Sequence, residues 1–282
     1  MSDNEPRVWV NGRLTGVDEP SIAALDHGVT VGDGAFETAK IDRGQVFAAT
    51  RHARRLDRTL SGLGLPAADH DYIAEGAKAV LEAGPQIEFG RLRYSVTGGA
   101  GPLGSDRDDS PLTYIVTAAA QPRPPQSASV AVVPWVRNER SAVAGLKTTS
   151  YAENVVALAY AKERGAIEAV FANTRGELCE CTGSNIFVVS GGVLLTPPLE
   201  SGCLAGITRE VVVEWCREDG MDVREQTLPV EVLREADEVF ITSSTKDVLG
   251  IHAVDDRALE VGPVTKRAAE VFARFSAERM DP

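Results

Sequence analysis

The proline-rich segment at residues 121–126 (Gln-Pro-Arg-Pro-Pro-Gln) constrains the fold more than any other part of the sequence. Proline fixes its backbone φ angle and lacks an amide hydrogen, so three prolines in six residues cannot continue a helix or a central strand. Strand-like apolar runs stand on either side of the segment. We therefore predict that 122–126 is an extended interdomain linker between an N-terminal small domain, 1–121, and a C-terminal domain, 127–282.

Composition narrows the classes of protein to which the chain can belong. With 43% hydrophobic and 25% charged residues, its 282 residues are ordinary for a globular protein of two domains. A net charge of −12 argues against nucleic acid or an anionic membrane surface as a partner. No apolar run is long enough for a membrane helix, and the polar N-terminus lacks the apolar core of a signal peptide. The expected location is the cytoplasm.

Apolar periodicity predicts a mixture of helices and strands. Asn11-Gly12 after a short apolar run predicts a hairpin turn. The predicted helices lie at 51–63, 71–83, 151–164, 207–218 and 263–279, and the predicted strands at 87–97, 112–117, 129–136, 168–172, 177–181, 185–189, 193–196 and 238–242. Since the two kinds of element do not strictly alternate, we predict an α+β fold.

Lys147 differs from the other five lysines in its surroundings. No charged residue occurs within five positions on either side of it, whereas the others lie among charged or helix-surface neighbours. A desolvated lysine has a lowered pKa, and its neutral amine can attack a carbonyl carbon. Context alone leaves two interpretations open, a reactive amine or a surface lysine that extends its charge into water.

Several other segments stand in a specific order around Lys147. They are Gly-Asp-Gly-Ala-Phe-Glu-Thr at 32–38, Glu-Leu-Cys-Glu-Cys-Thr-Gly-Ser-Asn at 177–185, Gly-Ile-Thr-Arg at 206–209 and Thr-Ser-Ser-Thr at 242–245. Together with Lys147, this set resembles the fold-type IV pyridoxal-phosphate enzymes, or class IV aminotransferases. The resemblance covers nearly the whole chain, and the combination is far more specific than any one segment.

The resemblance implies a smaller N-terminal α/β domain, a larger C-terminal pseudo-barrel domain and pyridoxal 5′-phosphate as the cofactor. Lys147 would form a Schiff base with the cofactor aldehyde and later move a proton. Glu180 would pair with the pyridine nitrogen, although without the resemblance it reads as a surface charge at a strand edge. Tyr151 would lie near the phenolic oxygen of the cofactor.

The cofactor phosphate needs hydrogen-bond donors. Gly206, Ile207 and Thr208 precede an apolar helical run, and amide groups at a helix N-terminus form an anion site. The alternative is that Thr208 simply caps the helix. By resemblance, the phosphate would also meet Arg55 and the hydroxyl groups that end a predicted strand, at Ser243, Ser244 and Thr245.

Two arginines are candidates for binding the substrate carboxylate. Strand alternation places Arg91 and Arg93 on one face, where guanidinium groups can grip a carboxylate through two hydrogen bonds. Alternatively, both lie on a sheet face that is open to water. The Arg-x-His pattern of many D-amino-acid aminotransferases is absent near this strand, so the carboxylate site stays open between these interpretations.

The resemblance leaves several activities possible, and we favour a D-amino-acid transaminase that uses a 2-oxo acid as acceptor. Aminodeoxychorismate lyase, which forms 4-aminobenzoate and pyruvate, is the main alternative, because lyases place a proton-donating threonine where Thr38 stands. Branched-chain aminotransferases rank third, since they usually carry tyrosine in place of Val31. A non-catalytic binding protein that kept the fold is a further alternative.

Family members are homodimers, and the resemblance implies that residues 27–31 reach the partner's site. No cysteine spacing suggests a metal site, and the four cysteines, at 179, 181, 203 and 216, are expected to be reduced thiols.

Overall fold

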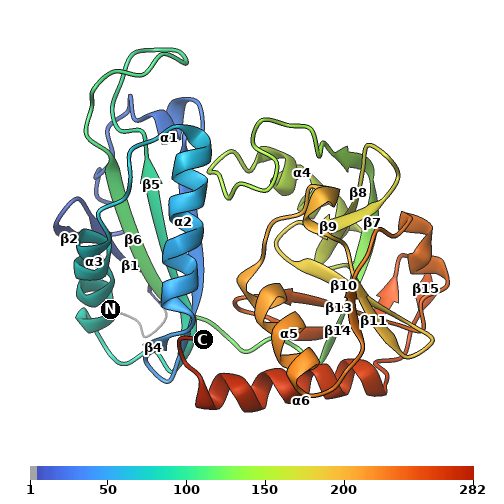
Figure 1. Cartoon of the computed structure of the whole chain (residues 1–282). Coiled ribbons are helices and arrows are strands. Elements are labelled where there is room, and N and C mark those ends of the chain that lie inside the picture. The colour runs from blue at the N-terminus through green and yellow to red at the C-terminus, as the bar shows by residue number, and fades with distance from the viewer. Residues whose placement is uncertain (1–4) are drawn as a thin grey trace. The chain divides into compact units, whose positions relative to one another are not determined.

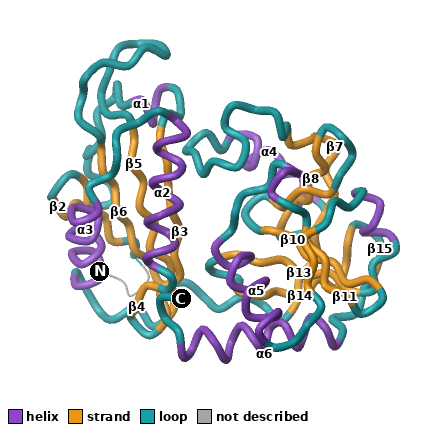
Figure 2. The backbone as a smooth tube through the Cα atoms, viewed as in Figure 1, coloured by secondary structure: helices purple, strands orange, loops and turns teal. Residues whose placement is uncertain are grey.

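The computed structural model describes residues 5–282 and divides into two compact units, which Figures 1 and 2 trace along the chain. Unit 1 comprises Met1–Arg123, Leu146–Tyr151 and Met280–Pro282, and unit 2 comprises Pro124–Gly145 and Ala152–Arg279. The chain first leaves unit 1 inside the proline-rich segment 122–126. The chain returns to unit 1 twice, at Leu146–Tyr151 and at Met280–Pro282, so the units are not divided by a single cut in this segment. Lys147 groups with the N-terminal unit and not with the domain that follows the linker.

Unit 1 is built on a six-stranded antiparallel sheet in the order β2-β1-β6-β5-β3-β4. Its strands are β1 (Arg7–Val10), β2 (Arg13–Thr15), β3 (Gly34–Asp42), β4 (Gln45–Val46), β5 (Phe89–Thr97) and β6 (Thr113–Ala120). Its helices are α1 (His27–Thr30), α2 (Ala49–Leu63) and α3 (His70–Glu82). The predicted hairpin is confirmed, because Asn11 and Gly12 join β1 to β2 with φ angles of 45° and 89°.

The sheet of unit 1 has one apolar face and one polar face. Leu92 and Val96 of β5 pack with Leu56 of α2 and Val80 of α3 in one buried cluster. Alternate positions of β5, including Arg93, point to the opposite face. This alternation agrees with the predicted strand, and it places the arginines away from the apolar core.

Unit 2 contains a nine-stranded mixed sheet in the order β12-β11-β10-β13-β14-β7-β8-β9, with β15 paired to β14. Its strands are β7 (Ser127–Arg137), β8 (Glu168–Asn173), β9 (Leu178–Cys181), β10 (Asn185–Ser190), β11 (Val193–Thr196), β12 (Val223–Glu225), β13 (Glu238–Ser243), β14 (Asp247–Val254) and β15 (Arg257–Ala258). Its helices are α4 (Ala152–Glu163), α5 (Ile207–Glu218) and α6 (Pro263–Glu278), with 3-10 turns η1 (Leu199–Ser201) and η2 (Val230–Arg234).

Helices cover the sheet of unit 2 in two places. Trp215 of α5 contacts the ring of Phe272 of α6 at 5.5 Å between centroids, and both helices pack against β13. Helix α4 lies on β7 and β8 around Phe171. Another apolar cluster, which includes Ile186 and Ile251, fills the space beneath η2. The sheet is thus covered on both faces, which explains its nearly continuous apolar strands.

Two long strands are absent from the sequence-based expectation. Strand β3 begins in the glycine-rich segment at 32–38, and β14 begins at the charged Asp247 and contains Gly250, so neither shows a clear apolar alternation. The predicted helix at 151–164 begins at Ala152, because Tyr151 belongs to unit 1. Among residues 5–282, no helix is long and apolar enough to cross a membrane.

Candidate active site

Lys147 lies against the first residues of β3 in unit 1. Its carbonyl oxygen accepts a hydrogen bond from the Phe36 amide at 3.0 Å, and its amide donates to Thr59 Oγ1 at 3.3 Å. The Thr149 amide also donates to the Gly34 carbonyl at 2.8 Å. These bonds make residues 146–150 an added edge of the sheet of unit 1. They hold the Lys147 backbone while its side chain stays half-buried.

Three of the expected site residues meet around the ring of Phe36. The Lys147 Nζ atom is 4.5 Å from the ring centroid, and Arg93 Cζ is 3.8 Å from it. The ring of Tyr151 meets Phe36 edge to face at 5.0 Å between centroids. An aromatic ring attracts cations through its negative face, so Phe36 can bring two positive charges close together.

The two candidate carboxylate-binding arginines differ in their surroundings. Arg93 is half-buried, and within residues 5–282 its guanidinium makes no ion pair or hydrogen bond. Burial lowers its pKa from the usual value. Arg91 is exposed, and its Nε donates to Gln121 Oε1 at 2.8 Å. Thr38 pairs with Arg93 across β3 and β5, and it is half-buried on the same face.

Arg55 belongs to a buried cluster with Glu37 and His52. Its Nε and Nη2 donate to the two Glu37 oxygens at 2.8 and 2.6 Å, and His52 Nδ1 lies 2.7 Å from Glu37 Oε2. Burial by itself raises the pKa of Glu37, but the Arg55 charge and the hydrogen bonds lower it to about 2. The carboxylate is therefore ionised, and it fixes the position of Arg55.

Glu180 lies on β9 of unit 2, beside β8. Its Oε2 accepts a hydrogen bond from the Leu204 amide at 2.9 Å, and its Oε1 is 3.3 Å from Arg137 Nε. The Arg137 guanidinium also stacks on Phe171, with Cζ 4.3 Å from the ring centroid. One amide and one guanidinium thus hold the carboxylate in position.

The predicted anion site lies at the N-terminus of helix α5. Gly206 is the N-cap residue, and no side chain caps this helix, so the alternative of a cap by Thr208 is wrong. Thr208 lies in the first turn and is buried. A Cβ atom at Gly206 would stand 1.9 Å from Asn185 Oδ1, so only glycine fits there. The amides of Ile207 and Thr208 therefore begin a helix whose side chains leave its N-terminus uncovered.

Strand β13 ends in two residues with hydroxyl groups, Thr242 and Ser243. Thr242 pairs with Asn185 across β13 and β10, and Asn185 Nδ2 donates to the Leu204 carbonyl just before α5. The Thr242 and Ser243 hydroxyls are buried and have no hydrogen-bond partner in the part of the chain that the structure describes. Buried hydroxyls without partners are costly, so an acceptor on a ligand would satisfy them.

The turn that follows β13 carries the other two expected phosphate ligands. Ser244 and Thr245 are half-buried in this turn, which is held by Lys246. Lys246 Nζ lies 2.7 Å from Glu168 Oε1, and Glu168 also accepts from Ser184 Oγ at 2.9 Å. This buried ion pair ties the turn to the β9–β10 connection that follows Glu180.

Comparison with known proteins identifies the family. The amino-transferase class IV family matches residues 34–254 of the chain. The chain belongs to the class IV aminotransferases. This family uses pyridoxal phosphate, and its fold, fold type IV, agrees with the mixed α and β architecture described above.

Individual class IV aminotransferases resemble the chain over almost its full length. A Methanocaldococcus jannaschii protein, provisionally named a branched-chain-amino-acid aminotransferase, is 31% identical and covers 94% of this chain and 95% of its own. The D-alanine aminotransferase of Listeria monocytogenes serotype 4b is 31% identical, with 94% of each chain covered. A Brucella abortus aminotransferase solved with pyridoxal phosphate bound has a TM-score of 0.85 and 27% identity, covering 96% of this chain and 99% of its own.

The residues present fit this cofactor. In unit 1, a half-buried lysine matches the aldehyde of pyridoxal phosphate. In unit 2, an oriented carboxylate matches the ring nitrogen, and an uncapped helix N-terminus and buried hydroxyls without partners among residues 5–282 match the phosphate. Sequence reasoning assigned no role to Phe36, Glu37 and His52. The three-residue spacing of His52 and Arg55 on one helix was a usable signal for a shared face. Nothing in the sequence around Arg137 indicates that it pairs with Glu180.

Proposed function

We propose that the chain is a transaminase that moves an amino group between an amino acid, with D-amino acids favoured, and a 2-oxo acid. Bound pyridoxal phosphate supplies an electron sink for the bonds at the substrate Cα atom. The protein supplies the amine that holds the cofactor, the base that moves the proton and the groups that orient the substrate. The observation that carries this proposal is the Arg93 guanidinium, which lies with Lys147 at the Phe36 ring and has no ion-pair partner among the described residues.

Lys147 holds the cofactor through its amine and then moves a proton at the substrate Cα atom. The backbone hydrogen bonds to Phe36 and Thr59 fix the position of the lysine backbone. The side chain can therefore swing without moving the strand that carries it. Tyr151, which is in contact with Phe36, lies close enough to direct this amine.

Arg93 binds the substrate carboxylate. A half-buried guanidinium that makes no ion pair within residues 5–282 gains strongly from a carboxylate partner, because two parallel hydrogen bonds replace lost hydration. Arg91 already bonds to Gln121 and is exposed, so we assign it no share in substrate binding.

Residues of unit 2 hold the other groups of the cofactor. Glu180 pairs with the ring nitrogen and keeps it protonated, while Arg137 and the Leu204 amide keep the carboxylate in place. The amides of Ile207 and Thr208 bind the phosphate together with the hydroxyls of residues 242–245. Arg55 of unit 1 is the further candidate for the phosphate through its guanidinium N–H groups, whose position Glu37 fixes.

The preference for D-amino acids is supported by the Listeria relative and by the absence of tyrosine at position 31. The purified holoenzyme is mixed with D-alanine and 2-oxoglutarate, and pyruvate is measured with a coupled lactate dehydrogenase. Pyruvate formation is expected. Activity with L-leucine and not with D-alanine would instead identify a branched-chain enzyme, as the name of the M. jannaschii relative suggests.

Identifying the lysine that carries the cofactor tests the first requirement of the transaminase proposal. Borohydride reduction followed by peptide mapping should place the pyridoxyl group on Lys147. Lys147→Ala should bind no cofactor covalently and lose at least about 1,000-fold in turnover. A pyridoxyl group on another lysine, or on none, would refute the proposal.

Arg93→Ala provides a second test, with Arg91→Ala as its matched control. Loss of the carboxylate anchor should raise KM for every amino donor about 30- to 100-fold, which is about 2–3 kcal/mol. The Arg91 variant should stay within about twofold of the wild type, as expected for an exposed side chain. Equal effects of the two variants would reassign the carboxylate site.

Aminodeoxychorismate lyase activity remains the second candidate because of Thr38. This hydroxyl lies on the same sheet face as Arg93 and directly across from it. In that reaction Thr38 would donate a proton to the departing pyruvate. Formation of 4-aminobenzoate from aminodeoxychorismate, and its loss in Thr38→Val, would establish the lyase.

We also propose that the protein is a cytoplasmic homodimer. Within residues 27–31, His27 is buried, but Val29 is 64% exposed and Val31 is 42% exposed. Exposed aliphatic side chains on a short segment favour burial against a partner. Light scattering on the purified protein should give twice the 30.0 kDa chain mass. A monomer in solution would refute this part of the proposal.

A further inference from the structure

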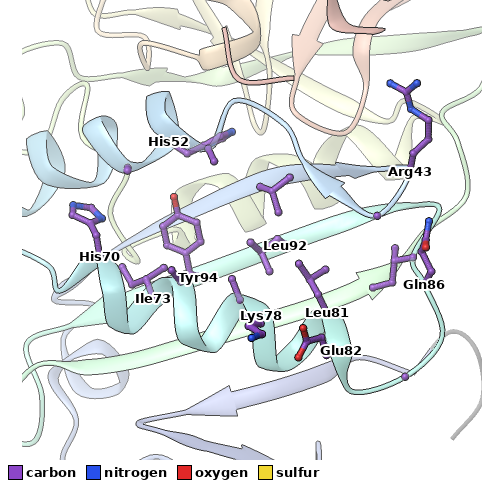
Figure 3. Close-up of a pocket in the computed structure, with 18 residues that line it drawn as sticks. Arg43, His52, His70, Ile73, Lys78, Leu81, Glu82, Gln86, Leu92 and Tyr94 are labelled. Carbon is purple, nitrogen blue, oxygen red and sulfur yellow. The ribbon is translucent and has the colours of Figure 1, made fainter. Parts of the chain in front are cut away.

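A cavity of about 720 Å3 lies in unit 1 between helices α2 and α3, above strand β5 (Figure 3). Its volume falls in the range of pockets that bind small molecules. The cavity is on the apolar face of the sheet, whereas Lys147 and Arg93 belong to the group around Phe36 on the polar face. It is therefore separate from the residues assigned to catalysis.

The sequence explains why this space exists. Ala49 and Ala53 stand four residues apart on α2, and Ala74 and Ala77 stand three apart on α3, so each pair shares one helix face. All four line the cavity. Their methyl groups stand where longer side chains would fill the groove between two helices.

A phenol group lies at the floor of this cavity. Tyr94 is only 6% exposed, and within residues 5–282 its hydroxyl makes no hydrogen bond. Figure 3 shows this hydroxyl directed toward His52 on α2, with Leu92 beside it on the same strand. A hydroxyl group that is so deeply buried is stabilised by any partner that enters the cavity.

His52 contributes a second polar atom to the same wall. It is 1% exposed, and its Nδ1 donates to the ionised Glu37 carboxylate at 2.7 Å. Burial lowers the pKa of His52, so the ring is neutral and keeps a lone pair on Nε2. Among the described residues, none forms a hydrogen bond with this Nε2 atom.

We propose that this cavity binds a small neutral molecule with an apolar body and one hydroxyl group, such as a simple phenol. The ligand hydroxyl donates to His52 Nε2 and accepts from the Tyr94 hydroxyl, while its body packs on the alanines and Leu92. Glu37 and Arg55 behind His52 neutralise each other, so no net charge favours an ionic ligand. The rim carries both signs, at Lys78 and Glu82.

Fluorine NMR of the holoenzyme with 4-fluorophenol tests the proposal, without any amino donor present. Saturable line broadening is expected, and 4-fluoroanisole, whose methyl-capped oxygen cannot donate, should bind at least five times more weakly. Tyr94→Phe should weaken 4-fluorophenol about fivefold and leave 4-fluorotoluene, which has no oxygen to accept a hydrogen bond, unchanged. Tyr72→Phe, which removes a phenol outside the cavity, is the control and should change neither.

Filling the cavity gives an independent arm. Ala53→Leu with Ala77→Leu should reduce 4-fluorophenol binding at least tenfold, whereas Ala67→Leu, at an exposed position outside the cavity, should not. Thermal melting checks that each variant is folded, and Tyr94→Phe decides the matter if the filled variant does not fold. Undiminished binding in the folded double variant, or equal losses of 4-fluorophenol and 4-fluorotoluene in Tyr94→Phe, would overturn the proposal. Neither arm depends on transaminase activity.

Discussion

Each unit contains a group of buried polar atoms, and the two groups differ in whether the protein itself supplies their hydrogen-bond partners. In unit 1, Glu37 accepts hydrogen bonds of 2.6 to 2.8 Å from Arg55 and His52, all within one cluster. In unit 2, the Thr242 and Ser243 hydroxyls are buried without a hydrogen-bond partner among the described residues. The protein itself satisfies the first group, and we propose that an acceptor on the cofactor satisfies the second.

This difference separates folding from binding. Removing one member of a satisfied buried ion pair leaves a charge without its partner, so the cost appears in protein stability. Removing a buried hydroxyl that has no partner costs the folded protein little, so the cost appears in ligand affinity. Variants in the two groups should therefore move different observables, and four predictions test this division.

Glu37→Ala should have the largest effect. It removes the carboxylate from the buried ion pair with Arg55, and the free energy of unfolding should fall by about 3–5 kcal/mol. Urea unfolding of the cofactor-free protein measures this change. Asp222→Ala, which breaks the exposed pair with Arg224, is the control and should cost less than about 1 kcal/mol. Similar losses in both variants would show that the buried Glu37–Arg55 pair contributes no more to stability than an exposed ion pair does.

Acid should remove the same contribution in the wild type. The pKa of Glu37 is about 2 when folded, below its usual value of 4.5, so its stabilisation is fully present above pH 4.5. As pH falls from about 4.5 toward 2, on the order of 3 kcal/mol should be lost. Urea titrations across this range measure the slope, and Glu37→Gln should flatten it. An unchanged slope would contradict the assignment.

Glu180→Gln should act on catalysis more than on folding. A neutral amide cannot hold the ring nitrogen in its protonated form, so kcat should fall about 100-fold, or about 2.7 kcal/mol. Stability should change by less than about 1 kcal/mol because the side chain is only half-buried. Glu177→Gln, whose carboxylate pairs with Arg175, is the nearby control and should keep its activity. Full activity of the Glu180 variant would remove the residue from the site.

Thr242→Val should give the smallest effect. In contrast to Glu37→Ala, it should weaken cofactor binding without lowering protein stability. The cofactor-free protein should keep its stability or gain up to about 1 kcal/mol, because a hydroxyl without a partner leaves the core. The Kd for pyridoxal phosphate should rise about fivefold, whereas the Kd for pyridoxal, which lacks the phosphate, should not change.

Thr265→Val is the matched control for that variant. Thr265 Oγ1 is also buried without a hydrogen-bond partner in residues 5–282, but it lies on α6, to which we assign no part in binding the cofactor. Its stability should respond as that of Thr242→Val does, with no change in either Kd. A weaker affinity in both variants would mean that Thr242 acts through packing and not through the phosphate.

The elements that the sequence predicts well are those with a clear apolar period. Helix α2 begins two residues before the predicted start at residue 51 and ends, as predicted, at Leu63, because Leu56 and Leu60 form one buried stripe. Strand β3 was missed, since its burial comes from β5 along one edge and from the Lys147 segment along the first residues of the other edge. Such non-local contacts leave no periodic signal in a short window.

The candidate site is predictable only where residue type alone suggests chemistry. A lysine without charged neighbours and a Gly-Ile-Thr segment can be singled out from the sequence, and so can an arginine pair on one strand. The structure distinguishes Arg93 from Arg91 because Gln121, thirty positions away, bonds only one of them. The Arg137–Glu180 pair likewise depends on β8 lying between their strands in the sheet.

The path of the backbone limits how this protein can be dissected. The chain crosses between the units four times, at 123–124, 145–146, 151–152 and 279–280. A fragment ending at residue 123 would lack Lys147, and a fragment starting at 124 would carry it without the β3 edge that holds it. One proteolytic nick at any crossing would leave three covalent tethers in place. Neither unit can therefore be produced complete by splitting the gene at one position.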